Sequence, residues 1–79
     1  MTYRLSIDPS LHAAYKHLPD TARQDLAVCL LDALVDPIAH SVPYGVDDGI
    51  MRTIGRGRVA GVILIGTDTI TLVQLTHVG

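Results

Sequence analysis

Arginine and histidine side chains in the last third of the chain are the residues best suited to carry chemistry. Arg52, Arg56 and Arg58 are closely spaced, and His77 follows near the end of the sequence. The arginines are permanently charged and suit a contact with phosphate, whereas His77 is the one residue nearby that can exchange a proton near neutral pH. Arginines at the starts of strands also serve as edge charges that keep proteins soluble, and this alternative stays open.

The charge of the chain is unevenly spread along the sequence. Residues 1–48 carry three basic and seven acidic side chains, a net charge of −4, whereas residues 49–79 carry three basic and one acidic, a net charge of +2. This distribution permits a local phosphate contact but excludes the extended basic surface of a general nucleic-acid-binding protein. Because 48% of the residues are hydrophobic, the composition also excludes a disordered chain.

Three other kinds of site have weaker support. Gly55, Gly57 and Gly61 imitate a dinucleotide-binding fingerprint, but no helix follows them, so we expect a tight turn with a bulge. The four histidines and Cys29 have no zinc-ligand spacing, and therefore we predict no metal and no cofactor. Cys29 is predicted to lie on an acidic arc of a helix without a basic neighbour, which argues against a catalytic thiol.

The length of the chain fits a single domain that spans residues 1–79. No apolar run approaches the roughly 20 residues needed to cross a bilayer, and the first residues lack the apolar segment of a signal peptide. A lone cysteine gives no disulfide framework and fits a reducing compartment. We therefore expect a cytoplasmic protein without a membrane contact.

The first half of the chain predicts one strand, two helices and a loop. Thr2–Ile7 alternates as a half-buried strand, with Tyr3, Leu5 and Ile7 on its inner face. Asp8 and Pro9 are suited to start a helix that continues to Leu18. A second helix is predicted from Pro19 to Leu34, followed by a loop from Pro37 to Asp48.

The second half of the chain predicts a small sheet. The apolar runs Ile50–Ile54, Arg58–Ile65 and Ile70–Val78 read as strands, and Gly66–Thr69 supplies the turn of a hairpin. Val59–Ile65 is apolar on both faces, as in a central strand. The predicted order is β-α-α-β-β-β, an α+β fold in which a helical hairpin packs on a small, mainly antiparallel sheet.

The second predicted helix has an apolar arc wider than one sheet face usually covers. The apolar residues from Leu26 to Val35 fill most of its circumference, while Asp25, Asp32 and Asp36 fall in a narrow arc. Either this helix is the more buried of the two, or part of its arc binds a partner helix or a second subunit. The second alternative includes a homodimer.

Five short motifs follow one another along nearly the whole chain. They are a strand Tyr3–Ile7, A-x-Y-x-x-L-P (Ala13 to Pro19), R-x-x-L (Arg23, Leu26) in a helix ending at Asp36-Pro37, G-x-G-R-V (Gly55 to Val59) and T-H-V (Thr76 to Val78). In this order the motifs resemble the RelE/ParE toxin superfamily of bacterial type II toxin–antitoxin systems. The resemblance implies a compact toxin that a cognate antitoxin protein neutralises.

The resemblance also implies a target and a set of site residues. RelE-like members cleave mRNA on the ribosome by attack of a 2′-hydroxyl on the adjacent phosphate, whereas ParE-like members poison DNA gyrase. Arg58 matches the arginine that stabilises the phosphate transition state, and Arg52 and Arg56 lie where those toxins keep basic residues. We therefore predict Arg52, Arg58 and His77 as catalytic residues, with His77 as base or acid, and Arg56 as an RNA-binding residue.

Several positions depart from the pattern of the superfamily. Val78 stands where members have a terminal arginine, Gly57 and Gly61 replace aromatic residues, and the sequence ends at Gly79 without a catalytic aromatic tail. The single lysine, Lys16, lies on the first predicted helix, far from the arginines in the sequence. These departures support an alternative function: a non-catalytic or gyrase-directed interaction module of the same fold that binds an antitoxin.

Overall fold

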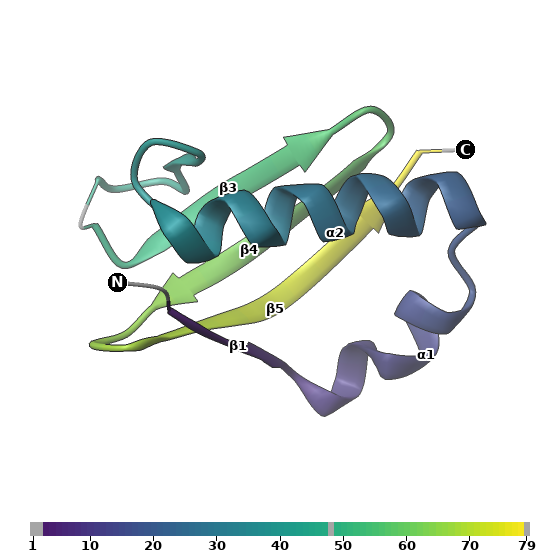
Figure 1. Cartoon of the computed structure of the whole chain (residues 1–79), viewed down its shortest axis with the longest axis horizontal. Helices are drawn as coiled ribbons and strands as arrows, with labels where there is room; N and C mark the ends of the chain where they lie inside the picture. The colour runs from purple at the N-terminus through teal and green to yellow at the C-terminus, as the bar shows by residue number, and fades with distance from the viewer. Residues whose placement is uncertain (1–2, 48, 79) are drawn as a thin grey trace.

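A five-stranded sheet crossed by one long helix forms the framework of the protein (Figure 1). The computed structural model describes residues 3–47 and 49–78. The strand order is β1-β5-β4-β3-β2; β1 is parallel to β5, and the other neighbours are antiparallel. The strands are β1 Arg4–Ile7, β2 Val42–Pro43, β3 Met51–Arg56, β4 Val59–Ile65 and β5 Thr69–His77. The predicted α+β fold with a mainly antiparallel sheet is confirmed.

β4 lies at the centre of the sheet, as its apolar composition predicts. Val59 and Ile63 are buried in the core beneath the helix, and Val62 is buried on the alternate face of the strand. The register between β4 and β5 shifts between Val62 and Ile63, so Val73 on β5 is an extra residue. The bulge therefore lies in the middle of this strand pair and not at the Gly55–Arg58 turn, where the sequence suggested it.

The turn between β3 and β4 consists of two residues, Gly57 and Arg58. Arg56 pairs with Val59 across it, and the register continues without interruption along both strands. Gly57 has φ of 61°, and no residue other than glycine has a positive φ in the described chain. A positive φ at the first turn residue alone is the pattern of a type II′ hairpin turn, which glycine adopts without steric cost.

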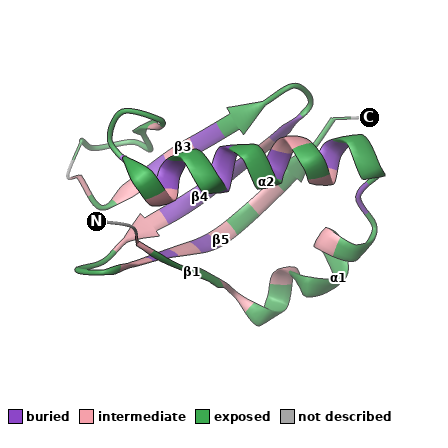
Figure 2. Ribbon diagram, in the orientation of Figure 1, coloured by how far each residue is buried: buried purple, intermediate pink, exposed green. Residues whose placement is uncertain are grey.

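The long helix α2, Asp20–Val35, covers one face of the sheet (Figures 1 and 2). Its bounds agree with the predicted helix to within one residue, because Pro19 fixes the start and Asp36-Pro37 the end. Large side chains between the two layers are fully buried, and each contributes about 1.5–3 kcal/mol on transfer from water. They are Leu26 from α2 and Ile54, Ile63, Ile70 and Leu72 from the sheet.

The first predicted helix is shorter and less regular than the sequence suggests. A 3₁₀ turn, η1, spans Pro9–Leu11, and the α-helix α1 spans only His12–Lys16. Asp8 caps η1 as predicted: its Oδ1 accepts a hydrogen bond from the Ser10 N–H at 2.9 Å. The Leu11 N–H donates to the Asp8 carbonyl three residues back, so this first turn closes too tightly to continue as one α-helix.

The connection predicted as a loop from Pro37 to Asp48 contains ordered structure. The Ser41 hydroxyl donates to the Pro37 carbonyl, and β2 then pairs with β3 at the edge of the sheet. The Tyr44 N–H extends this pairing by donating to the Met51 carbonyl at 3.1 Å. Asp48 itself, like Thr2 of the first predicted strand, lies outside the described residues. In residues 3–47 and 49–78, no helix is long and apolar enough to cross a membrane.

Candidate functional site

The turn between β3 and β4 meets the end of β5 at one end of the sheet (Figure 1). Val59 pairs with Arg56 on one side and with His77 on the other, so these three residues form one row across three strands. The Val78 N–H donates to the Arg58 carbonyl at 2.9 Å. The structure therefore brings together three of the four predicted site residues, which we call the hairpin-end site: Arg56, Arg58 and His77.

Arg58 and His77 are both exposed to solvent. Within residues 3–47 and 49–78, the guanidinium group of Arg58 forms no hydrogen bond or ion pair, and neither does the His77 imidazole. A free guanidinium presents its donors in a fork that matches two phosphate oxygens. The hairpin-end site thus combines an uncommitted cation at the turn with a group at the end of β5 that can transfer a proton.

Arg56 is partly committed to a contact inside the protein. Its Nε donates to Oδ1 of Asp25 on α2 at 3.3 Å, and the side chains are 57% and 36% exposed, respectively. An ion pair this exposed contributes little to stability and exchanges readily with other ions. Arg56 can therefore leave Asp25 for a phosphate that binds at the turn.

Arg52 lies apart from the other three residues. It lies four positions before Arg56 along β3, which is about 14 Å in an extended strand. Its side chain is 8% exposed, and all three guanidinium nitrogens donate to the connection that follows α2. Nε bonds to the Ser41 hydroxyl at 2.6 Å and Nη2 to the Ser41 carbonyl at 2.9 Å, while Nη1 lies 3.3 Å from Oδ1 of Asp47.

The environment of Cys29 differs from the one the sequence predicts. Cys29 lies on α2 near Asp25 and Asp32, as the sequence predicts, but it is buried and has Arg56 as a basic neighbour, which the sequence did not predict. Burial raises the pKa of the Cys29 thiol, and the nearby positive charge of Arg56 opposes that shift without cancelling it. A buried thiol with a raised pKa is a weak nucleophile at neutral pH. The described residues contain no group of three His, Cys, Asp or Glu side chains that could hold a metal ion.

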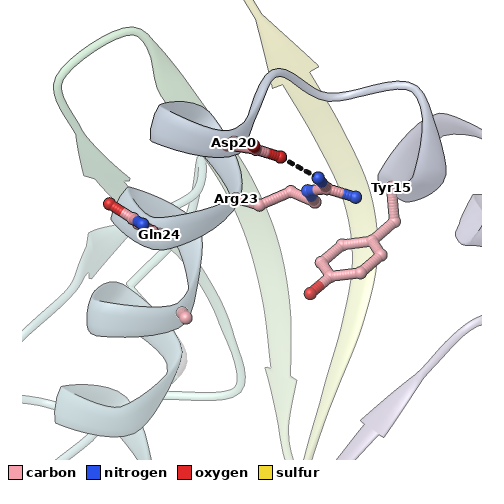
Figure 3. A pocket seen from close by; sticks show the side chains of 5 residues that line it. Tyr15, Asp20, Arg23 and Gln24 are labelled. Carbon is pink, nitrogen blue, oxygen red and sulfur yellow. Dashed lines mark hydrogen bonds and ion pairs between the residues drawn. The ribbon is translucent and has the colours of Figure 1, made fainter.

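The described part of the surface has hollows at several places. One of about 390 Å³, between α1 and the start of α2, is lined by Tyr15, Asp20, Arg23, Gln24 and Ala27 (Figure 3). A second, beside β3, contains His40 and Thr53, and a third lies between β1 and α2. None of these three is lined by Arg56, Arg58 or His77. Sequence periodicity could not find the hollows, because they arise where separate elements meet.

An exposed cation and a histidine on an open surface suit a large ligand better than a small one. Small-molecule sites are usually concave and bury most of the ligand. A polymer with a charged backbone can instead lie across an exposed end of a sheet and be held by a few arginine–phosphate contacts. The hairpin-end site therefore has the chemistry of a phosphate contact with an adjacent proton-transfer group.

The fold matches solved structures of bacterial toxins. It superposes on the isolated RelE toxin of E. coli with a TM-score of 0.80 at 18% identity, over 98% of this chain and 85% of that one. A double arginine-to-alanine mutant of E. coli RelE in the free state gives the same TM-score and identity, with 98% and 84% covered. The toxin–antitoxin complex RelBE2 from Mycobacterium tuberculosis gives a TM-score of 0.81 at 15% identity, and the match covers 99% of this chain and 100% of that one.

These structures define the class of fold to which the chain conforms. No protein-family model and no curated protein sequence matches it. The chain has a RelE-like toxin fold, as its motifs predicted. Since the identities are 15–18%, the similarity extends to the arrangement of helices and strands only. The chemistry of the hairpin-end site depends on the residues that this chain places there.

Proposed function

We propose that the chain is the toxin of a type II toxin–antitoxin pair and that it cleaves mRNA on the ribosome. The observation that carries the proposal is the meeting of Arg58 and His77 at an exposed end of a RelE-like sheet. One structural neighbour is a toxin–antitoxin complex, which supports a cognate antitoxin as partner. mRNA and the ribosome are the further partners that this function requires.

The proposed reaction needs no metal or cofactor. The 2′-hydroxyl oxygen of one nucleotide attacks the adjacent phosphorus, and the bond to the 5′-oxygen of the next nucleotide breaks, leaving a cyclic phosphate and a free 5′-hydroxyl. A base must take the 2′ proton and an acid must supply a proton to the leaving oxygen. His77 fills one of these roles, and Arg58 stabilises the charge that develops on the phosphate oxygens. The ribosome and mRNA supply the other proton-transfer group.

The remaining arginines take different parts in the proposal. Arg56 adds a second phosphate contact once it leaves Asp25, because its ion pair is exposed. Arg52 is buried under the connection after α2, and we assign it the positioning of that connection, not contact with RNA.

A second candidate function is a non-catalytic or gyrase-directed interaction module that binds an antitoxin. The observation that favours it is the commitment of two arginines to contacts inside the protein, which leaves Arg58 as the one uncommitted arginine of β3, β4 and their turn. Such a module needs the fold and its surfaces but no proton transfer. A homodimer belongs with this alternative, because self-association would cover apolar surface without any catalytic step.

Induced expression in a bacterial host tests the proposal. The unaltered chain is expected to arrest growth, and Arg58→Ala to relieve the arrest at equal soluble level while keeping its circular dichroism spectrum. Arg4→Ala, which removes an exposed arginine from the opposite end of β1 and β5, is the matched control and should still arrest growth. Growth arrest by Arg58→Ala would favour the second candidate function. If the unaltered, folded chain does not arrest growth, the proposal that it is a toxin is rejected.

A further inference from the structure

An acidic side chain of α2, Asp25, reaches the hairpin-end site. It lies in the first half of the helix, which Figure 1 shows at the same end of the molecule as the turn between β3 and β4. Its Oδ1 accepts a hydrogen bond from Nε of Arg56 at 3.3 Å. Its Oδ2 lies only 2.5 Å from the point where a Cβ on Gly57 would stand. Both carboxylate oxygens of Asp25 therefore face the turn.

The absence of a side chain at Gly57 permits this approach. A Cβ at this position would come closer to the Asp25 carboxylate than real Cβ atoms come to their neighbours, so a larger residue would push Asp25 away. Gly57 thus serves the turn in two ways, through its positive φ of 61° and through the space it leaves for the carboxylate. The close contact of Asp25 with the turn depends on residue choices in two separate elements.

The register of the sheet directs Arg56 toward α2. Arg56 pairs directly with Val59, which is buried in the core cluster that includes residues of α2. Directly opposed residues of antiparallel strands project to the same side of the sheet. The positive charge of Arg56 also acts on the thiol of Cys29, one helical turn after Asp25, where it opposes the rise in pKa that burial causes. The guanidinium of Arg56 therefore lies against α2.

The two arginines at the turn are consequently unequal as phosphate ligands. The guanidinium of Arg58 has no hydrogen bond or ion pair with the residues in 3–47 and 49–78, whereas Arg56 must first release Asp25. An exposed ion pair of this kind weakens the binding of a competing anion by about two- to fivefold. A first phosphate therefore binds Arg58 more readily than Arg56.

We propose that Asp25 is an internal competitor for Arg56 and sets the order in which the hairpin-end site binds phosphate groups. Arg58 takes the first phosphate, and a second phosphate of the same chain, held nearby by the first contact, then displaces Asp25. The ligand that fills both positions has consecutive phosphodiester groups, as single-stranded RNA does. The inference rests on the proposed function in that this ligand is the mRNA strand. Asp25 tunes binding and takes no part in proton transfer.

A titration of the full chain with inorganic phosphate tests the order of binding without RNA or growth arrest. The side-chain Nε–H resonances of Arg56 and Arg58 in an NMR spectrum report the two positions separately. We expect phosphate to shift the Arg58 resonance at a lower concentration than the Arg56 resonance. Asp25→Asn removes the charge and keeps the shape. It should raise the phosphate affinity at Arg56 by about three- to fivefold, and at Arg58 by less than about twofold.

Asp32→Asn is the matched control. It removes the same charge from the same helix seven residues later, about 10 Å along the axis. This is about the distance over which physiological salt screens a charge. The phosphate affinity at Arg56 should therefore change by less than about 1.5-fold in this variant. Both variants should keep the circular dichroism spectrum of the unaltered chain.

A double-mutant cycle separates competition for Arg56 from a general effect of charge. The probe is a short, fluorescein-labelled 2′-O-methyl RNA strand, which has no free 2′-hydroxyl and cannot be cleaved. In the unaltered chain, Asp25→Asn should strengthen its binding by about three- to fivefold. In the Arg56→Ala background, the same substitution should change the affinity by less than about 1.5-fold. Fluorescence anisotropy measures all four affinities.

Two results would overturn the inference. The first is an Arg56 resonance that phosphate shifts no more readily in Asp25→Asn than in the unaltered chain, or that phosphate shifts in neither. The second is a loss of mRNA cleavage by Asp25→Asn at saturating substrate, which would make Asp25 a catalytic residue. A chain that cleaves no mRNA but shows the expected change at Arg56 would reject the proposed function and support the competition by Asp25.

Discussion

The backbone N–H of Val78 donates to the carbonyl of Arg58 at 2.9 Å, and this bond fixes the end of β5 against the hairpin turn. His77 thus takes its position relative to Arg58 from the register of β4 and β5. That register includes the shift between Val62 and Ile63, and a slip by one residue would move His77 to the other face of the sheet. The bulge in the middle of the sheet therefore decides which residues meet at its end.

Replacing Gly57 should destabilise the hairpin turn more than replacing Gly55. Gly57→Ala places a Cβ on a residue with φ of 61°, and that atom would lie 2.5 Å from Oδ2 of Asp25. We expect a loss of about 1–3 kcal/mol in the free energy of unfolding, measured by urea denaturation. Gly55→Ala is the control, because its Cβ meets ordinary contacts at 3.6 Å and 3.8 Å. Equal stability of the two variants would contradict the turn geometry.

Removing the Arg52 side chain should loosen the connection after α2. Arg52→Ala leaves the carbonyls of Ser41 and Ile38 without the donors of two part-buried hydrogen bonds, and we expect a loss of about 1–3 kcal/mol in the free energy of unfolding. Hydrogen exchange should rise in residues 37–47 while α2 stays protected. Arg4→Ala removes only an exposed ion pair, so a change below about 1 kcal/mol is expected. An unaltered exchange pattern in Arg52→Ala would reject the anchoring role.

The Cys29 thiol should react slowly in the folded protein. Burial raises its pKa and keeps reagents away, so alkylation by iodoacetamide at pH 8 should be at least about tenfold slower than in urea. A thiol whose pKa is raised on folding favours the folded state at lower pH, and this contribution is lost as pH rises toward the folded pKa. Alkylation of the native protein at the unfolded rate would show that Cys29 is accessible.

The stabilising effect of the Asp8 cap should depend on pH. Hydrogen bonds from the backbone N–H and the side chain of Ser10 lower the pKa of Asp8. A carboxylate with a lowered folded pKa contributes stability above its unfolded pKa, and loses it as pH falls through the folded value. The urea midpoint of Asp8→Ala should therefore lie below that of the unaltered chain at pH 7 and approach it near pH 2. A difference in urea midpoint that does not change with pH would show that the lowered pKa of Asp8 does not contribute to stability.

The long helix and the sheet could be predicted because local signals and long-range packing agree there. Pro19 and Asp36-Pro37 bracket α2, and the β-branched run of β4 suits a central strand covered on at least one side. The first helix could not be predicted in detail, since its break depends on one tight hydrogen bond from Leu11 to Asp8. Short helices take their form from such contacts more than from periodicity.

The hairpin-end site could be predicted only in part. Arg58 and His77 are far apart in the sequence, and their motifs together with the hairpin pattern placed them near each other. The burial of Arg52 could not be foreseen, because its partners are mostly hydroxyl and carbonyl groups of a connection without a regular sequence pattern. Cys29 lies near Asp25 and Asp32 as predicted, but its burial and the approach of Arg56 could not be predicted, since a helical projection alone does not say which arc faces the sheet.

Cleavage of an abundant mRNA in a reconstituted bacterial translation system is the most direct test of the central claim. Primer extension maps cuts after addition of the purified chain, with and without an initiation inhibitor. The account predicts cuts that require translation, lose at least about a hundredfold in rate with Arg58→Ala, and decline less with His77→Lys than with His77→Ala. Cuts that Arg58→Ala leaves unchanged, or no cuts from a folded chain that arrests growth, would contradict it.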